Sequence, residues 1–185
     1  MPPRRFRSHP HPRTHLKHYL WPEIQLNIWI LTVFAASAIC LGIFAWFIAV
    51  QDELNLGIPW LLPYMLTITT LTLVFIITVL VLAAQGFLLP GIILIGTFIL
   101  FVLWLTGLVE TSLQMYGVAA NINGNCRIWV DGNRVGGDNL DTMAWIAQSS
   151  LCNCWRTAFA FELVNTVFFV WMMVMAFKVY RDVHH

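Results

Sequence analysis

A glutamate and an asparagine stand within the most apolar stretch near the C-terminus. Glu162 and Asn165 lie between Ala158 and Phe177, in a run whose other residues are mostly aliphatic or aromatic. At a spacing of three residues, both side chains lie on one face of a helix. An acidic residue inside a membrane span is costly unless it is paired, and it suggests a functional site. Three roles fit it: a hydrogen bond between helices, an ion or proton relay, or a contact with another protein.

A relay has the least support of the three. It needs titratable partners on other spans, and the apolar segments upstream contain no Asp, Glu, Lys, Arg or His. Glu162 also lies only about two helical turns from Trp155 and Arg156, which mark a membrane interface. We therefore expect Glu162 and Asn165 to hold the helices together or to contact a partner.

Three cysteines stand between the last two apolar segments. Cys126, Cys152 and Cys154 lack further Cys or His residues at the spacing of a zinc site. On the oxidising side of a membrane such thiols form disulfides. We expect a disulfide from Cys126 to either Cys152 or Cys154, which leaves the third thiol free or paired with another chain.

Two other polar sets resemble metal sites only loosely. They are the tail histidines His9, His11, His15 and His18, and the loop residues Asp131, Asn133, Asp138 and Asp141. Prolines interrupt the first set, and the second lacks the order and closing glutamate of an EF-hand. The sequence contains no nucleophile–base pair, phosphate loop or metal quartet. We predict no enzymatic activity, no cofactor, no metal and no nucleic-acid partner.

Composition indicates the class of protein. Of the 185 residues, 59% are hydrophobic and 10% are charged, and the mean hydropathy is +0.74. A soluble domain of this size cannot bury so much apolar side chain. Four apolar runs are long enough to span a bilayer, at about 24–50, 61–83, 91–109 and 157–178. We predict an all-α polytopic membrane protein, a four-transmembrane-helix bundle over residues 23–180.

The first span carries small residues at helical spacing. They are Ala35, Ala38, Gly42, Ala45 and Ala49, which recur every three or four positions. Small residues let membrane helices approach closely. We predict that Ala38, Gly42 and Ala45 form a helix-packing or partner-contact face.

The second span is rich in threonine. Its members are Thr67, Thr69, Thr70, Thr72 and Thr78. Threonine hydroxyls in helices usually bond to their own backbone. We expect that pattern for most of them, with one or two facing Glu162.

The segment between the last two spans, residues 110–156, is the only sizeable loop. Ile128-Trp129-Val130 followed by Asp131-Gly132 predicts a small hairpin. Apolar residues spaced from Leu140 to Leu151 predict a short amphipathic helix on the bundle or the membrane surface. With the expected disulfide, this makes a small, braced extracellular loop.

Basic residues in the flanks predict the orientation. The tail formed by residues 1–22 contains no acidic residue and five basic ones: Arg4, Arg5, Arg7, Arg13 and Lys17. Lys178 and Arg181 adjoin the short C-terminal tail, residues 181–185, whereas the first loop has no basic residue. The positive-inside rule then places both termini in the cytosol. The five basic residues are also expected to attract anionic lipids, at about 1 kcal/mol each.

The start of the last span resembles that of a known family. It reads Cys154-Trp155-Arg156-Thr157-Ala158-Phe159-Ala160-Phe161 and continues to Val164-Asn165. With the layout of four spans over residues 24–178, it resembles MARVEL-type four-span membrane proteins, particularly the small ones of filamentous fungi. The resemblance implies a non-enzymatic role in membrane apposition, lipid microdomains or protein sorting. The chain departs from that family in having Glu162 inside this helix and in its longer second extracellular loop.

These observations predict a membrane organiser or accessory subunit. It acts by lateral helix packing, as a homo-oligomer or within a larger membrane complex, in the plasma membrane or the secretory pathway. The alternative is a small channel or transporter subunit that functions as an oligomer. An organiser predicts that Glu162 meets protein or lipid, whereas a channel predicts that it faces a water-filled path.

Overall fold

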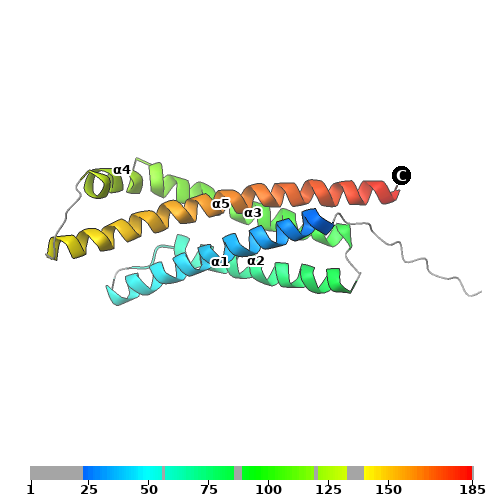
Figure 1. The fold of residues 1–185 in the computed structure, drawn as a ribbon, viewed down its shortest axis with the longest axis horizontal. Coiled ribbons are helices and arrows are strands. Elements are labelled where there is room, and N and C mark those ends of the chain that lie inside the picture. The colour runs from blue at the N-terminus through cyan, green and yellow to red at the C-terminus, as the bar shows by residue number, and fades with distance from the viewer. Residues whose placement is uncertain (1–22, 56, 86–88, 119–120, 133–139, 185) are drawn as a thin grey trace, which may run out of the picture.

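The structure, a computed structural model, describes residues 23–55, 57–85, 89–118, 121–132 and 140–184 (Figure 1). Its four long helices are α1 (Glu23–Glu53), α2 (Leu61–Ala84), α3 (Pro90–Tyr116) and α5 (Leu140–His184). Between α3 and α5, the short helix α4 (Ile122–Cys126) continues into a π-helix, η1 (Arg127–Asp131). None of the described residues lies in a strand. The prediction of an all-α, four-span bundle is confirmed.

Each of the four long helices is apolar enough to cross a membrane. The mean hydropathy of their apolar stretches is 2.4, 2.6, 2.7 and 1.8, in chain order. The shortest of them, α2, has 24 residues, and about 20 residues suffice to cross the hydrocarbon core. The chain is therefore an integral membrane protein.

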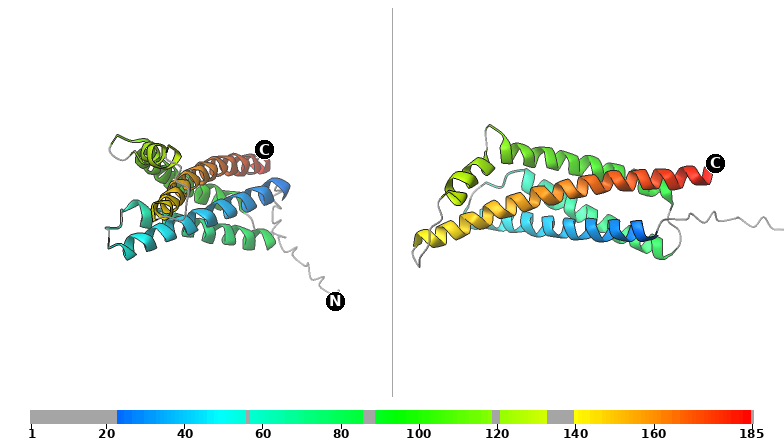
Figure 2. Two further views of the ribbon diagram at one scale, coloured as in Figure 1. Left: turned by 60° about the vertical axis from the view of Figure 1, so that its left-hand side comes forward. Right: turned by 45° about the horizontal axis from the view of Figure 1, so that its top comes forward.

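The long helices alternate in direction and pack as a ring. α1 and α3 each contact both α2 and α5, whereas α1 does not contact α3 and α2 does not contact α5. The start of α1 and the end of α5 lie at one end of the bundle (Figures 1 and 2). α4 and η1 lie at the other end, which we call the capped end. α5 thus lies between α1 and α3 along the bundle.

Asparagine, proline and glycine mark the helix ends. Asn55, just after α1, adopts a left-handed φ of 51°, which asparagine tolerates better than most residues. Pro90 opens α3, where its missing N–H leaves no intrahelical bond unmade. The Asn121 side chain accepts a hydrogen bond from the Gly124 N–H at 2.8 Å and so caps α4. α5 contains neither glycine nor proline and continues for 45 residues.

Two predictions for the segment before the last span need correction. The helix predicted from Leu140 to Leu151 is present, but it is the first part of α5 and not a separate short helix, because no glycine or proline separates Leu140 from Ala158. The expected hairpin is replaced by η1, which contains Ile128, Trp129 and Val130. A lone two-stranded hairpin is marginally stable, whereas a helix satisfies its own backbone groups. The hairpin's second half, residues 133–135, lies outside the described residues.

The connection is also shorter than predicted. α3 continues to Tyr116, two turns past the expected end of the third span at residue 109, and α5 starts well before residue 157. Most of residues 110–156 is therefore helix. This extension brings the last turns of α3 alongside α5 near the capped end.

Buried tryptophans tie neighbouring helices together. Trp104 Nε1 of α3 donates a hydrogen bond to Thr72 Oγ1 of α2 at 2.9 Å. Trp29 Nε1 of α1 donates to the Phe168 carbonyl of α5, also at 2.9 Å. Both indole rings are fully buried. Because an indole N–H in an apolar core needs an acceptor, these residues fix which helix faces meet.

The interface of α2 and α3 depends on two glycines. A Cβ atom at Gly96 would overlap the ring of Phe75, and one at Gly107 would overlap the side chain of Met65. The absent side chains leave room for these larger residues of α2. By contrast, a Cβ at Gly91, near the start of α3, would meet nothing within 4 Å.

We expect Gly96→Leu to destabilise the bundle and Gly91→Leu to leave it nearly unchanged. Leucine at residue 96 must displace the Phe75 ring, and such overpacking costs about 1–3 kcal/mol. Thermal unfolding of the purified protein in mild detergent measures the difference. Equal midpoints for the two variants would contradict the close α2–α3 contact.

Candidate functional site

Glu162 and Asn165 lie in the interior of the bundle, on the side of α5 that faces its neighbours. Thr111 Oγ1 of α3 donates a hydrogen bond to Glu162 Oε1 at 3.1 Å. One turn along α5, Asn165 Nδ2 donates to Ser37 Oγ of α1 at 3.3 Å. All four side chains are 0% exposed. We call Ser37, Thr111, Glu162 and Asn165 the buried polar cluster.

The buried polar cluster joins three helices. α5 supplies Glu162 and Asn165, which reach α3 on one side and α1 on the other. Hydrogen bonds between membrane helices contribute about 0.6 kcal/mol on average and about 1.7 at most. Leaving a buried partner unsatisfied costs more, about 1–3 kcal/mol. The cluster therefore favours one relative placement of the three helices over others.

Cys40 of α1 lies close to this cluster. Its side chain is fully buried and lies near Glu162. Its Sγ also makes a long contact of 4.0 Å with the carbonyl oxygen of Ala158. A thiol is a weak hydrogen-bond donor, so the Cys40 side chain packs against α5 as a small apolar group.

Sequence reasoning did not identify the partners of Glu162 and Asn165. Thr111 lies two residues beyond the predicted end of the third span, so the sequence places it in the loop. Ser37 stands among the alanines of α1, where the small-residue pattern drew attention to the opposite face. A small hydroxyl residue in an apolar run is a signal that indicates Ser37. Thr111 follows Glu110 outside the apolar run, so the local sequence gives no such signal for it.

The threonines of α2 do not face Glu162, so that prediction is wrong. Each of Thr67, Thr69, Thr70, Thr72 and Thr78 donates to a carbonyl of its own helix. The physical reason is the order of helices, because α2 and α5 occupy opposite corners of the ring. Only Thr72 also serves a neighbouring helix, as the acceptor for Trp104.

The small-residue face of α1 points away from the other helices of the chain. Ala38, Gly42 and Ala45 are exposed, and a Cβ built at Gly42 would meet nothing within 4 Å. The side of α1 that packs in the bundle carries other residues, among them Trp29, Val33, Ala36, Ser37, Cys40 and Phe44. Packing of Ala38, Gly42 and Ala45 within the chain is therefore not observed. Their contact with a partner stays a prediction.

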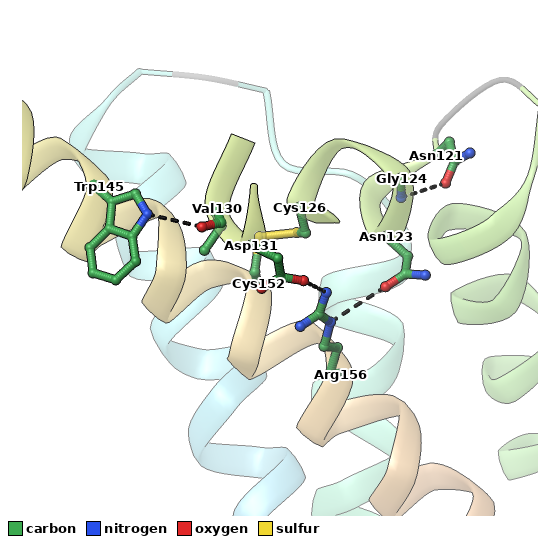
Figure 3. Close-up of polar contacts among 9 residues, drawn as sticks. All are labelled: Asn121, Asn123, Gly124, Cys126, Val130, Asp131, Trp145, Cys152 and Arg156. Atoms are coloured by element: carbon green, nitrogen blue, oxygen red, sulfur yellow. Dashed lines mark hydrogen bonds and ion pairs between the residues drawn. A yellow bond between two sulfur atoms is a disulfide. The ribbon is translucent and has the colours of Figure 1, made fainter. Parts of the chain in front are cut away.

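A disulfide attaches α4 to α5 at the capped end (Figure 3). It joins Cys126 to Cys152 with a Cα–Cα distance of 5.8 Å and a sequence separation of 26. Cys154 is a half-buried free thiol. Positions two apart on a helix point to nearly opposite sides, so only one of the two α5 cysteines can face α4. The predicted disulfide from Cys126 is confirmed, and its partner is Cys152.

Polar contacts complete this attachment (Figure 3). Arg156 of α5 forms an ion pair with Asp131 at 2.9 Å and donates to Asn123 Oδ1 at 3.4 Å. Trp145 Nε1 donates to the Val130 carbonyl at 3.1 Å. The ion pair is partly exposed and contributes little, whereas a disulfide of this separation stabilises by on the order of 3–4 kcal/mol. The disulfide is therefore the main restraint on the cap formed by α4 and η1.

The remaining predicted residues fall outside the described part of the chain. These are the lipid-contact residues Arg4, Arg5, Arg7, Arg13 and Lys17, the tail histidines, and two of the loop oxygen donors, Asn133 and Asp138. Among the described residues, no group of three or more His, Cys, Asp and Glu side chains is placed to hold a metal ion.

No protein-family model, no curated protein and no solved structure matches the chain. The resemblance to MARVEL-type proteins therefore stays a prediction based on the span layout and the start of α5. The buried polar cluster and the disulfide-attached cap must be interpreted from their own geometry.

We expect Thr111→Val to lower the free energy of unfolding by about 1 kcal/mol, because Glu162 Oε1 loses its donor. Thr106→Val is the matched control on the same helix, since the exposed Thr106 hydroxyl bonds only to the Val102 carbonyl. Unfolding of both variants in mild detergent measures the difference. The hydrogen bond is refuted if both variants unfold alike.

Alkylation of the denatured, unreduced protein should label Cys40 and Cys154 and spare Cys126 and Cys152. The paired sulfurs become reactive only after reduction, because a disulfide has no thiolate to alkylate. Peptide mass spectrometry identifies the labelled positions. A free Cys126, or a peptide that links Cys126 to Cys154, would contradict the structure.

Proposed function

We propose that this protein is a non-enzymatic membrane organiser or accessory subunit. It acts by lateral helix packing in a membrane complex or a lipid microdomain, as a homo-oligomer or with other membrane proteins. Its setting is the plasma membrane or the secretory pathway, with both termini in the cytosol. The resemblance to MARVEL-type proteins points in the same direction.

The exposed small-residue face of α1 is the observation that carries this proposal. Ala35, Ala38, Gly42, Ala45 and Ala49 are all exposed, and their spacing of three and four residues forms one straight seam along the helix. Helices in a bilayer associate where small side chains let backbones come close. A seam of this kind that none of the described helices covers fits a helix of another protomer or protein.

The hydrogen bonds that the buried polar groups make between helices also support an organiser. Thr111, Glu162, Asn165 and Ser37 bond to each other across helices. Glu162 is buried inside its own bundle, so in this conformation it does not line a path between protomers. Such an arrangement stabilises a fixed bundle, which can then present a constant surface to a partner.

The alternative is a small channel or transporter subunit that functions as an oligomer. The observation that favours it is Glu162 itself, because carboxyls within spans often mark ion or proton pathways. The described parts of the other three spans supply no acidic or basic side chain deep in the bundle to continue such a path. The organiser is therefore the better supported function.

In the proposed function, the N-terminal tail contacts anionic lipids. Its five basic residues, with the cytosolic orientation, would hold the protein near anionic lipids of the inner leaflet. This contact would favour lipid surroundings that are rich in anionic headgroups.

We expect the double substitution Ala38→Leu with Gly42→Leu to reduce lateral association, because the added side chains prevent close approach. We measure the mass of the complex isolated in mild detergent and the molar ratio of each co-purifying protein to this chain. Ala160→Leu, an exposed alanine on α5, is the matched control and should leave the mass unchanged.

An unchanged complex in the double variant would refute the role of this face. Ion flux through proteoliposomes that disappears in Glu162→Gln would instead favour the channel alternative.

A further inference from the structure

Two oxygen atoms of the buried polar cluster have no hydrogen-bond donor among the described residues. They are Glu162 Oε2 and Asn165 Oδ1. Both side chains are fully buried and lie one turn apart on the same face of α5. Buried polar atoms normally have a hydrogen-bond partner, and leaving the bond unmade is unfavourable. Since both atoms are acceptors, whatever satisfies them must carry a proton or a positive charge.

The basic side chains of α5 nearest to Glu162 in sequence do not supply that positive charge. Arg156 pairs with Asp131 at the capped end, and Lys178 lies more than four helical turns farther along α5. The sequence contains no Lys, Arg or His from residue 19 to residue 126, and none from residue 157 to residue 177.

α3 directs the uncharged Thr111 hydroxyl toward Glu162, and the neighbouring Cys40 of α1 has no cationic group. No Cα atom of α2 lies within 8 Å of a Cα atom of α5. α3 contains one acidic residue, Glu110, and no basic residue.

A buried carboxylate without a counter-charge is very unfavourable in a bilayer. Its desolvation remains unfavourable even after the surrounding structure relaxes. The Thr111 hydroxyl bonds to Oε1, but a neutral donor does not cancel the charge. The balance must therefore come from a cation taken up from solution.

We propose that the buried polar cluster binds one monovalent cation, a proton or an alkali ion, at Glu162 Oε2 and Asn165 Oδ1. A single carboxyl matches a single positive charge. Carboxylate and amide oxygens are ligands for hard cations, and divalent ions require more of them, usually with further carboxylates. The bound cation makes the cluster electrically neutral and so stabilises the contact of α5 with α1 and α3. This inference does not depend on the proposed organiser function.

Infrared spectroscopy of the full chain in lipid nanodiscs tests the proposal. The difference between wild type and Glu162→Gln isolates the carboxyl of residue 162, and Glu110→Gln identifies the signal of the neighbouring carboxyl. Spectra are compared in sodium chloride, potassium chloride and choline chloride at equal ionic strength and neutral pH. Choline is too large to enter a packed bundle, so it supplies ionic strength without a ligand.

Two outcomes support the proposal and distinguish its two cations. A carboxylic-acid band from residue 162 in all three salts identifies the proton. An acid band in choline that becomes a carboxylate band in sodium or potassium identifies the alkali ion. A carboxylate band in choline chloride, where no alkali ion is present, would overturn the proposal.

The part played by Asn165 is tested separately. Asn165→Leu should shift the band of residue 162 or abolish its response to alkali ions, because the second oxygen is lost. Asn165→Ala serves the same purpose if leucine disturbs folding. The two-oxygen site is overturned if residue 162 gives the same band and the same salt response in wild type and in both variants.

Discussion

The hydrocarbon core of a bilayer offers no water to a polar side chain, and the bundle interior is arranged around that constraint. Glu162, Asn165 and Trp104 each find a partner on a neighbouring helix. Each such bond is individually weak, but the alternative is an unsatisfied group in an apolar medium. The pairings therefore determine which helix faces meet. α5 takes part in several of them because Glu162 and Asn165 are both on this helix.

At the capped end the same helix is held by covalent chemistry. The backbone there leaves the hydrocarbon, so hydrogen bonds compete with water and stabilise less. The Cys126–Cys152 disulfide replaces them as the main restraint, and it holds α4 and η1 against the first turns of α5. Over the stretch from Cys152 to Asn165, α5 thus passes from a sulfur-linked cap into a hydrogen-bonded core. This stretch positions both the cap and the buried polar cluster.

The outer surface of the bundle contrasts with its interior. Most outward side chains are large and apolar, which suits contact with lipid tails. The seam of α1 that includes Ala38 and Gly42 is exposed and yet small. Lipid contact does not require small side chains, whereas a second helix benefits from them. This difference, together with the spacing of the seam, links the fold to the proposed role in lateral association.

The sequence by itself determined the class of the protein, the four spans and the involvement of Cys126 in a disulfide, because length, hydropathy and cysteine spacing are local properties. It also singled out Glu162 and Asn165, since polar residues in apolar runs are visible without a structure. Their partners Thr111 and Ser37 were decided by tertiary structure, because the order of helices around the ring and the true end of α3 set them. The same holds for the choice of Cys152 over Cys154 and for the outward direction of the α1 seam. Periodicity shows that residues share a helix face, but only packing decides what that face meets.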